Sequence, residues 1–223
     1  MYIGNTVLPL LELKSTLVFD SVHEGEKKVK QKHDTQNKIL SVWGLDFSSV
    51  AIDLLKKDQR YIRANAEKRS QALVWDITST HPRDVSCHLE NSGDISLLLF
   101  CLSAISPDKM PQAAKFVAAT LKPGGMLLFR DYGRYDEAQL KLGTSRAKRL
   151  ANNFYAKHDG TRCYYFDLND LERLFGTTNG NYGAGLEIVE LKYINRIYRN
   201  RAEEVIRRRV WVQGRFRKPT LTK

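Results

Sequence analysis

The residues from Asp94 to Leu102 form the most hydrophobic run of the chain, and this run limits the folds that the chain can adopt. The run is short and Pro107 follows soon after it, so it predicts a central parallel β-strand rather than a helix. A helix is expected from about Pro111 to Leu121, and a further buried strand begins at Met126. Strand, helix and strand in this order are typical of a doubly wound α/β fold.

The same alternation extends toward the amino terminus. Apolar runs at Ile39–Leu45 and Ala72–Trp75 predict two more buried strands. A helix is expected at Thr6–Leu13, and Ser48 or Ser49 is expected to cap another helix. We therefore expect a Rossmann-like, mostly parallel sheet.

The remaining segments complete one expected domain, residues 1–223. Leu186–Tyr198 and Arg209–Phe216 predict two closing strands that form an antiparallel edge pair. The polar, charged run at about residues 20–38 lacks an apolar period and predicts an exposed insertion, and Thr16–Phe19 predicts a short strand. Residues 134–175 have helical and loop character and are expected to form a second insertion on the substrate side of the sheet.

Polar side chains gather where one of these strands ends. Lys122–Gly125 predicts a Pro-Gly-Gly turn into an apolar strand that runs directly into Arg130, Asp131 and Tyr132. Gly133 is expected to let the backbone turn sharply there. In an open α/β sheet the ligand crevice lies outside the carboxyl ends of the strands. Taken alone, these residues are equally compatible with chemistry and with a solvated strand end that carries an Arg–Asp pair.

Two earlier strands each end in a single acid, Asp46 and Asp76. At successive strand tips, such acids can bind a ribose diol and an adenine amino group, which favours an adenosine-containing cofactor. Strand-end acids are also common turn formers, so each of them alone is a weak signal. A nicotinamide site would require Gly-x-Gly-x-x-Gly between the first strand and helix, but only Gly4 precedes the first expected helix.

Composition excludes several classes of protein. An apolar fraction of 42% and an aromatic fraction of 10% are those of a globular chain. No run is long enough to span a membrane, no His or Cys spacing fits a metal site, and no Gly-x-Ser-x-Gly nucleophile elbow occurs. Three widely spaced cysteines indicate a reducing compartment, so a cytoplasmic location is expected, with nuclear and organellar sites left open.

Positive charge is concentrated at the carboxyl end. The net charge is +11, and Val189–Lys223 contains eleven Lys or Arg against three Glu. Aromatic residues are interleaved with this charge, which argues against a merely solvated tail. The segment favours a polyanionic partner, and nucleic acid fits better than a membrane because the segment is not a simple amphipathic helix.

Several motifs resemble the tRNA N3-methylcytidine methyltransferase family. The resemblance begins at Gly4–Leu11, passes through both strand-end acids, and is close at Leu102–Met110. It is most specific at Phe129–Asp136, together with Asn153–Tyr155 and Asp159–Arg162. It covers nearly all residues apart from the insertion at residues 20–38 and a glycine-rich patch near Gly176–Gly185, and it closes with Phe216–Pro219.

The resemblance implies a class I methyltransferase fold, S-adenosylmethionine as methyl donor and a cytidine of a tRNA anticodon loop as acceptor. By position, Asp46 would hold the ribose, and Asp76 with Ile77 would hold the adenine. Gly4 would lie near the methionine part, and Leu99 would line the pocket. The family also implies tRNA as a partner and, in some members, a helper protein that selects the tRNA.

The resemblance also suggests roles at the acceptor side. Asp131 is expected to contact the exocyclic amine or offset the developing positive charge, and Tyr132 or Tyr135 to stack on the base. Arg130 and Arg162 would hold flanking phosphates or order the loop, although an internal ion pair of Arg130 with Asp131 or Asp136 is an alternative. The tRNA backbone would be held by the basic carboxyl end, including Arg215, Arg217 and Lys218.

One departure from the family bears on activity. The family has a strand and a glycine-rich acidic loop before the position of Gly4, so we expect this chain to be truncated at its amino terminus and to lack the first strand. A catalytically impaired tRNA-binding or partner-binding relic is therefore an alternative. A methyltransferase that acts on a small molecule or a protein is a third reading, but it leaves the basic end unexplained.

Overall fold

A computed structural model describes residues 4–12, 41–79, 89–177, 183–200 and 205–220. The chain divides into two compact units, Met1–Asp76 and Ile77–Lys223, and each is described by itself. The expected strand at Thr16–Phe19 and the expected insertion at residues 20–38 lie outside the described residues. The expectation of one domain over residues 1–223 stays a prediction.

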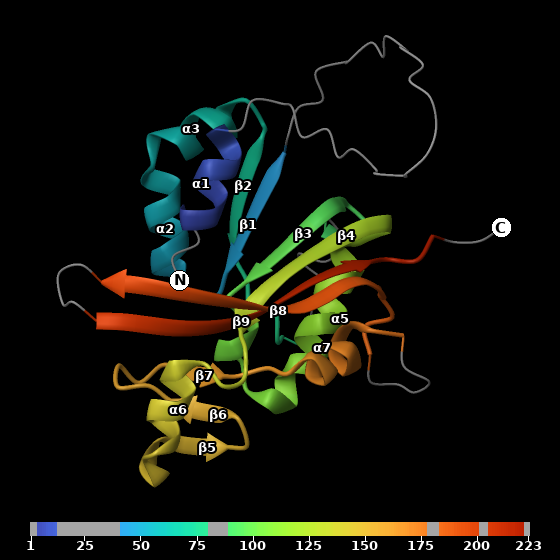
Figure 1. The fold of residues 1–223 in the computed structure, drawn as a ribbon. Coiled ribbons are helices and arrows are strands. Elements are labelled where there is room, and N and C mark those ends of the chain that lie inside the picture. The colour runs from blue at the N-terminus through green and yellow to red at the C-terminus, as the bar shows by residue number, and fades with distance from the viewer. Residues whose placement is uncertain (1–3, 13–40, 80–88, 178–182, 201–204, 221–223) are drawn as a thin grey trace, which may run out of the picture. The chain divides into compact units, whose positions relative to one another are not determined.

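The first unit packs three helices against a pair of strands (Figure 1). Strand β1 (Val42–Asp46) pairs in parallel with β2 (Ser70–Val74), as their apolar runs predict. Helix α1 (Gly4–Glu12) buries Val7, Leu8 and Leu11 in a core that also contains Ile52, Leu55 and Tyr61. Continuous apolar burial of this kind explains why the predicted helix and strands form where the sequence places them.

Capping side chains set the boundaries of the next two helices. Ser48 caps α2 (Ser49–Lys57), and its hydroxyl accepts a hydrogen bond from the Ala51 N–H at 3.2 Å, which confirms the expected cap. Asp58 then ends α2 and caps α3 (Gln59–Ala66) by accepting from the Arg60 N–H at 2.9 Å. Helix α3 was not predicted, because its polar, charged sequence buries only Tyr61 and Ala64.

The second unit is built on a four-stranded sheet in the order β3-β4-β9-β8 (Figure 1). Strands β3 and β4 are parallel, whereas β9 is antiparallel to both of its neighbours. The expected antiparallel edge pair is therefore confirmed. The four strands are β3 (Gly93–Leu99), β4 (Leu121–Tyr132), β8 (Glu187–Asn200) and β9 (Val205–Arg217).

Two helices and a cluster of aromatic rings form the core of this unit. Helix α5 (Met110–Thr120) matches the predicted helix, packs on β3 and β4, and also contacts α7 (Leu168–Phe175). The ring of Phe129 lies 5.9 Å from Phe166 and 5.5 Å from Phe175, and Phe175 lies 4.9 Å from Phe216. All four rings are buried, so β4, α7 and β9 are held together by aromatic packing.

The Pro-Gly-Gly segment departs from its prediction. It does not stand between α5 and a strand that begins at Met126, since β4 already begins at Leu121 and bulges where Gly93 and Ile95 pair with Leu121 and Met126. Gly124 adopts a positive φ of 80°. A Cβ on Gly125 would lie 2.9 Å from the Lys122 carbonyl oxygen, so glycine is needed for this close approach.

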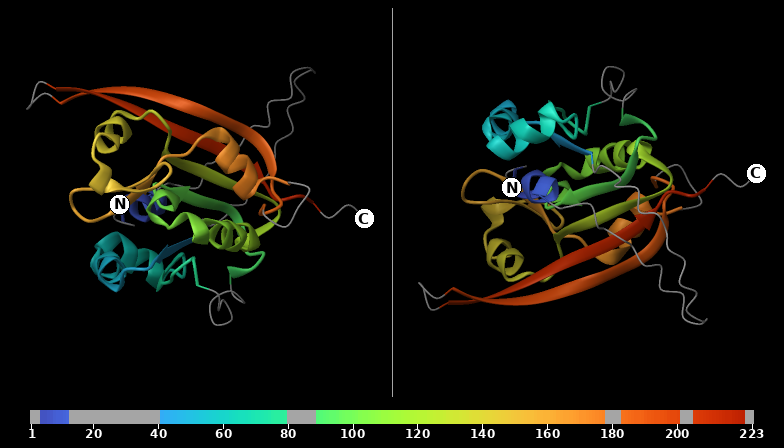
Figure 2. Two further views of the ribbon diagram at one scale, coloured as in Figure 1. Left: turned by 90° about the horizontal axis from the view of Figure 1, so that it is seen from below. Right: turned by 90° about the horizontal axis from the view of Figure 1, so that it is seen from above.

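The segment at residues 134–175 was expected to be helical and loop-like, and it also forms a small antiparallel sheet in the order β5-β6-β7. Helix α6 (Glu137–Gly143) lies beside this sheet (Figures 1 and 2). The sheet was missed because strands of three residues carry almost no alternation. Its strands are β5 (Arg149–Ala151), β6 (Phe154–Ala156) and β7 (Arg162–Tyr164).

Candidate active site

The sharpest feature of the second unit is Asp131, whose side chain is completely buried. Strand β4 continues through Tyr132, where it still pairs with Trp211 of β9. Because side chains alternate along a strand, Asp131 lies on the same buried face as Leu127 and Phe129. The sequence correctly places Asp131 at a carboxyl strand end, but it does not reveal that the carboxylate points into the interior.

Fixed donors hold the buried carboxylate. Oδ2 accepts a hydrogen bond from the Ser103 N–H at 3.0 Å, and Oδ1 accepts one from the Tyr132 N–H at 2.9 Å. Loss of solvent raises the pKa of Asp131 to about 6, although both N–H groups, the Ser103 side chain and the Lys157 charge act in the opposite direction. Near pH 7.5 the site therefore holds a negative charge in an environment of low polarity.

Arg130 pairs across the sheet rather than with an acid. Its guanidinium donates to Gln213 Oε1 from Nε at 3.0 Å and also from Nη2. It lies 5.5 Å from the centre of the Trp211 ring. The alternative of an ion pair with Asp131 or Asp136 is not what the structure shows, because β9 takes up this side chain.

Tyr132 is surrounded by rings and cations. Its ring lies 5.1 Å from Phe100 and 6.0 Å from Tyr165. Lys157 Nζ and the Arg209 guanidinium each lie 5.2 Å from the ring centre. These contacts come from the segment after β3, from the segments on either side of β7 and from β9. They leave Tyr132 half-buried and fix the position of its ring.

The loop after β4 is anchored to β9. Asp136 is fully buried, and its Oδ2 accepts hydrogen bonds from Arg209 Nε at 2.8 Å and from the Val210 N–H at 2.9 Å. Tyr135 has a positive φ of 65°, an uncommon conformation for a bulky residue, yet 67% of it is exposed. The anchored Asp136 thus holds an exposed aromatic ring at the tip of the strand.

Gly133 has a different role from the one expected. It is absent from the described residues with positive φ, so no left-handed turn requires it. A Cβ at this position would lie 3.1 Å from Val210 Cγ1, 3.2 Å from the Trp211 carbonyl carbon and 3.3 Å from Tyr193 Cδ1. Because β4 and β9 approach closely here, any side chain at this position would push these neighbours by a few tenths of an ångström.

The first unit brings its two strand-end acids to one edge. Asp46 is the last residue of β1 and is opposite Val74, and the exposed Asp76 follows two residues later. Asp46 Oδ1 accepts a hydrogen bond from the Ser48 N–H at 2.9 Å. The expected matched ends are therefore present, and one carboxylate oxygen of Asp46 also forms the local turn. Gly4 is the first residue of α1.

Two apolar residues expected at the cofactor lie in the second unit. Ile77 follows Asp76 directly in a turn and is half-buried. Leu99 is the last residue of β3, is half-buried, and pairs in register with Arg130 of β4. Leu99 thus shares the carboxyl edge of the β3–β4 pair with the Asp131 region.

The basic residues expected at RNA occupy separate places. Arg162, on β7, is exposed and lies 5.8 Å from the Phe154 ring centre. Arg215 pairs with Glu190 at 3.2 Å, and the exposed Arg217 pairs in register with Met126. Met126 lies six residues from Tyr132 along β4, roughly 20 Å away at the rise of a strand.

Lys218 takes part in an internal contact. Its Nζ donates to the Leu121 carbonyl oxygen at 2.8 Å and to Asn91 Oδ1 at 2.9 Å. Its backbone also bonds to Gly124 and Gly125. This lysine therefore fastens the end of β9 to the start of β4.

The residues predicted to bind RNA did not include a basic arm formed by the far ends of β8 and β9. Strands β8 and β9 continue to pair from Asn195↔Val210 to Asn200↔Val205, beyond the last β4–β9 pair at Trp211 (Figure 1). Ile197 and Ile206 are exposed on this arm, at 72% and 57%. The concentration of charge in the sequence pointed to the segment, but only the strand register shows which residues extend past the sheet. Its exposed arginines are Arg196, Arg199, Arg207 and Arg208.

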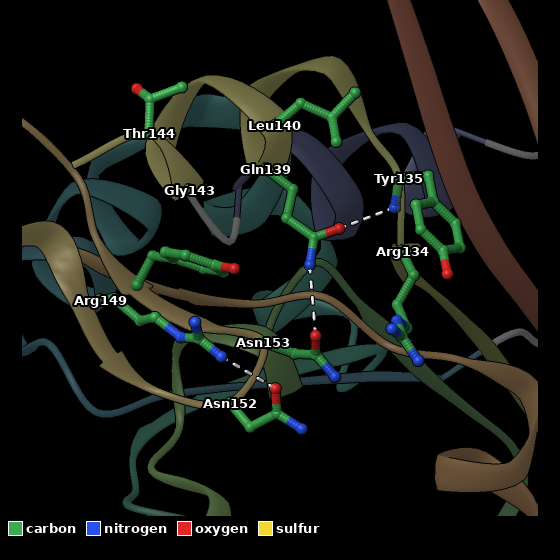
Figure 3. Close-up of a pocket in the computed structure, with 10 residues that line it drawn as sticks. Arg134, Tyr135, Gln139, Leu140, Gly143, Thr144, Arg149, Asn152 and Asn153 are labelled. Carbon is green, nitrogen blue, oxygen red and sulfur yellow. Dashed lines mark hydrogen bonds between the residues drawn. The ribbon is translucent and has the colours of Figure 1, made fainter. Parts of the chain in front are cut away.

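A cavity of about 470 Å³ opens beside the loop that follows β4 (Figure 3). It lies between the loop after β4, helix α6 and the turn that joins β5 to β6. None of its lining residues is acidic. The lining consists of Arg134, Tyr135, Gln139, Leu140, Gly143, Thr144, Arg149, Asn152, Asn153 and Tyr155.

Within the described residues, no group of three or more His, Cys, Asp or Glu side chains is arranged to hold a metal ion. No helix in the described part of the chain has the length and apolar character needed to cross a membrane. Cys163 is buried, and burial raises the pKa of its thiol to about 11, whereas Cys101 is exposed. Cys87 lies outside the described residues.

Solved structures share the fold of this chain. A SAM-dependent methyltransferase from Methanosarcina mazei matches 81% of the chain and 82% of its own length with a TM-score of 0.56 at 17% identity. A SAM-dependent methyltransferase from Anabaena variabilis also gives a TM-score of 0.56, over 80% of this chain and 68% of its own, at 14% identity. The fold is therefore that of the class I methyltransferases.

No protein-family model matches the chain, but curated relatives do. A Bos taurus tRNA N(3)-cytidine methyltransferase is 37% identical over 97% of this chain and 48% of its own length. A Schizosaccharomyces pombe tRNA N(3)-methylcytidine methyltransferase is 36% identical over 96% of this chain and 58% of its own. A Dictyostelium discoideum protein named O-methyltransferase 3 is 40% identical over 78% and 37%.

The chain spans about half the length of the curated relatives that it matches. The match nevertheless runs through both units and includes the strand-end acids, the β4 tip and the basic arm. This chain is therefore similar to tRNA N(3)-methylcytidine methyltransferases over nearly its whole length, and it has the fold of the class I methyltransferases.

Proposed function

We propose that this chain transfers a methyl group from S-adenosylmethionine to N3 of a cytidine in the anticodon loop of a tRNA. The observation that carries the proposal is the identity of 36–37% over about 97% of the chain with relatives of that name. The class I fold and the buried carboxylate at the β4 tip support it.

The residues that we assign to the cofactor have the chemical groups that an adenosine requires. Two carboxylates stand at the same ends of neighbouring parallel strands, which suits a ribose diol and an adenine amino group. We assign Asp46 to the ribose, Asp76 and Ile77 to the adenine, Gly4 to the methionine part and Leu99 to the pocket wall. When bound, the cofactor supplies a methyl group on a sulfonium leaving group.

The acceptor needs little acid–base help from the protein. Cytosine N3 carries a neutral lone pair, so it needs no deprotonation, but the ring becomes cationic as the methyl group is added. Asp131 would stabilise this growing charge, because an ionised carboxylate in a buried setting acts strongly on a nearby cation. Its hydrogen bonds from Ser103 and Tyr132 keep the carboxylate fixed while the charge develops.

Positioning the base is the second task. N3 lies on the pairing edge, so the cytidine must be unpaired or turned out of its stack. Tyr135 is the better candidate for stacking, since it is 67% exposed and has one cation, Arg134, at 5.2 Å from its ring centre, whereas two cations flank the half-buried Tyr132 ring. Arg130 would act by holding the β4 tip against Gln213, and the exposed Arg162 would contact a flanking phosphate.

The backbone of the RNA would be held by the arm of β8 and β9 together with Arg215 and Arg217. Phosphate contacts of this kind position an RNA without selecting its sequence. A helper protein would then supply the choice of tRNA. A cytoplasmic location is proposed on the widely spaced cysteines alone.

The decisive experiment is methyl transfer from labelled S-adenosylmethionine to total tRNA by the 223-residue chain, followed by nucleoside analysis. N3-methylcytidine as the labelled nucleoside is the expected result. A labelled nucleoside of another kind, or label in protein or small molecules, would contradict the proposed acceptor. Bound tRNA with no label transferred would instead support the relic that lacks catalysis.

Substitution of Asp131 tests its assigned role within that assay. Asp131→Asn keeps the size of the side chain but removes its charge, so the rate of methyl transfer should fall by roughly a hundredfold while donor and tRNA binding persist. Asp94→Asn is the matched control, because Asp94 is an exposed acid on β3. An Asp131→Asn chain that retains the full rate would remove Asp131 from the mechanism.

A further inference from the structure

The cavity beside α6 shares Tyr135 with the residues assigned to methyl transfer, but it lies apart from the buried carboxylate. Asp131, Tyr132 and Arg130 are not among its lining residues, yet it begins at Arg134 and Tyr135, two and three residues beyond Tyr132. Its volume of about 470 Å³ lies in the range of small-ligand pockets. A group bound here would therefore sit close along the chain to the β4 tip, but outside it.

Three amide side chains give the cavity its polar character. Gln139 is 7% exposed and bridges two partners: its Oε1 accepts from the Tyr135 N–H at 2.7 Å, and its Nε2 donates to Asn153 Oδ1 at 3.4 Å (Figure 3). Asn152 and Asn153 form the two-residue turn between Ala151 and Phe154. Asn153 has a positive φ of 58° in this turn, a conformation that asparagine tolerates.

Amides held on a tight turn are suited to reading a nucleobase. An amide offers a donor and an acceptor side by side, which matches the edge of a base. The rigid turn and the buried Gln139 fix the direction of these groups before any ligand arrives. The rings of Tyr135 and Tyr155 supply apolar surface in the same wall.

The charged part of the lining is entirely basic. Arg149 Nη2 donates to Asn152 Oδ1 at 3.3 Å, which uses one of the five N–H donors of a guanidinium. Arg134 Nη1 pairs with Asp167 at 3.3 Å, but its Nε is buried without a hydrogen-bond partner among the described residues.

We propose that this cavity binds one unpaired nucleotide of the RNA substrate, other than the cytidine that is methylated. The inference rests on the proposed function and deepens it by assigning a second nucleotide site to the same RNA. Asn152, Asn153 and Gln139 contact the base, Arg149 and Arg134 contact the backbone, and occupation of the pocket sets which loop position reaches the β4 tip.

Filling the cavity tests the assignment. Gly143 lines it from α6, and a Cβ there would meet only Tyr155 Oη, at 3.9 Å, so Gly143→Leu places a side chain in the space without a clash at its base. Lys141→Leu is the matched control, since it adds the same side chain to α6 at an exposed position that does not line the cavity. Asn152→Ala is a second probe, at an exposed turn position.

The measurement is the affinity of the 223-residue chain for an anticodon-arm stem–loop RNA and for versions with one abasic nucleotide at each loop position in turn. In the unaltered chain, one position besides the methylated cytidine should cost on the order of tenfold in affinity when its base is removed. In Gly143→Leu and Asn152→Ala that same removal should cost less than about twofold, while Lys141→Leu should behave as the unaltered chain.

The other outcomes overturn the inference in distinct ways. If every abasic position has the same effect with and without Gly143→Leu, the cavity holds no nucleotide. If the loop position whose effect is lost in Gly143→Leu is the methylated cytidine itself, the cavity is the acceptor pocket and not a second site. If Gly143→Leu removes the effect of one abasic position but no N3-methylcytidine forms, the proposed function fails while the pocket remains an RNA site. A chain that binds none of these RNAs overturns both proposals.

Discussion

At the scale of single residues, the burial of Asp131 predicts how stability depends on pH. Its pKa is raised to about 6 in the folded chain, from an ordinary value of 3.8. Between these values the folded state keeps a proton that the unfolded state has lost, so raising the pH favours unfolding. By pH 7.5 the carboxylate should lower the free energy of unfolding by about 3 kcal/mol relative to pH 3.

Asp131→Asn isolates this effect because asparagine does not titrate. Relative to the unaltered chain, the variant should gain up to about 3 kcal/mol of unfolding free energy as the pH rises from 4 to 7.5. Urea unfolding of both chains at several pH values across this window measures the difference. A difference that stays constant with pH would show that Asp131 has an ordinary pKa.

Gly133 yields a second prediction at this scale. A methyl group there would be pressed against Val210, Trp211 and Tyr193, at 3.1 to 3.3 Å, so Gly133→Ala should destabilise the chain by about 1–3 kcal/mol. Gly143→Ala is the matched control, since it lies in α6 with only Tyr155 Oη at 3.9 Å, and it should be neutral or stabilising by up to about 1 kcal/mol. Thermal unfolding of both variants compares them, and equal midpoints would refute the close-approach argument.

At the scale of elements, the arm of β8 and β9 should dominate binding of the RNA backbone. Each phosphate contact that is lost lowers the slope of log affinity against log salt by about one. Arg196→Ser with Arg199→Ser should therefore lower the slope by one to two and weaken binding at low salt. Arg215→Ser with Arg217→Ser carries the same charge change at the other end of β9.

The comparison of these two pairs decides where the backbone lies. A larger effect of the arm pair is expected, because Arg215 is already paired with Glu190. A larger effect of the second pair would instead place the RNA near the amino end of β4. Titrations of a labelled stem–loop at four or five salt concentrations supply both slopes.

The elements also show what the sequence could predict. Long apolar runs identified β1 to β4, and the antiparallel pair of β8 and β9, because continuous burial leaves a clear pattern. The three-residue strands β5 to β7 and the polar helix α3 leave no such pattern. The same holds for the candidate site. The sequence placed Asp131 at the end of a strand, but its burial could not be predicted, because it depends on β4 pairing with β9 as far as Tyr132 and Trp211. The cavity beside α6 takes Tyr135 and Asn153 from segments that the family resemblance had singled out, but its shape joins three elements and has no signal in the sequence.

At the scale of the whole molecule, the buried thiol of Cys163 offers a probe of global opening. Its side chain is inaccessible, and burial raises its pKa to about 11, so the thiol should react only when the second unit opens. In a chain with Cys87→Ser and Cys101→Ser, labelling at pH 8 should be on the order of a thousandfold slower than in urea. Rapid labelling without denaturant would show that this unit opens locally around β7.

The position of β9 in the sheet has a consequence for how the molecule is made. This strand lies between β4 and β8, and it supplies Gln213 to Arg130, Arg209 to Asp136 and Lys218 to the start of β4. Yet it is the last of the described elements to be synthesised. A growing chain on the ribosome therefore carries β4 with an unfinished tip until β9 emerges, so a nascent chain should bind RNA only after β9 has been made.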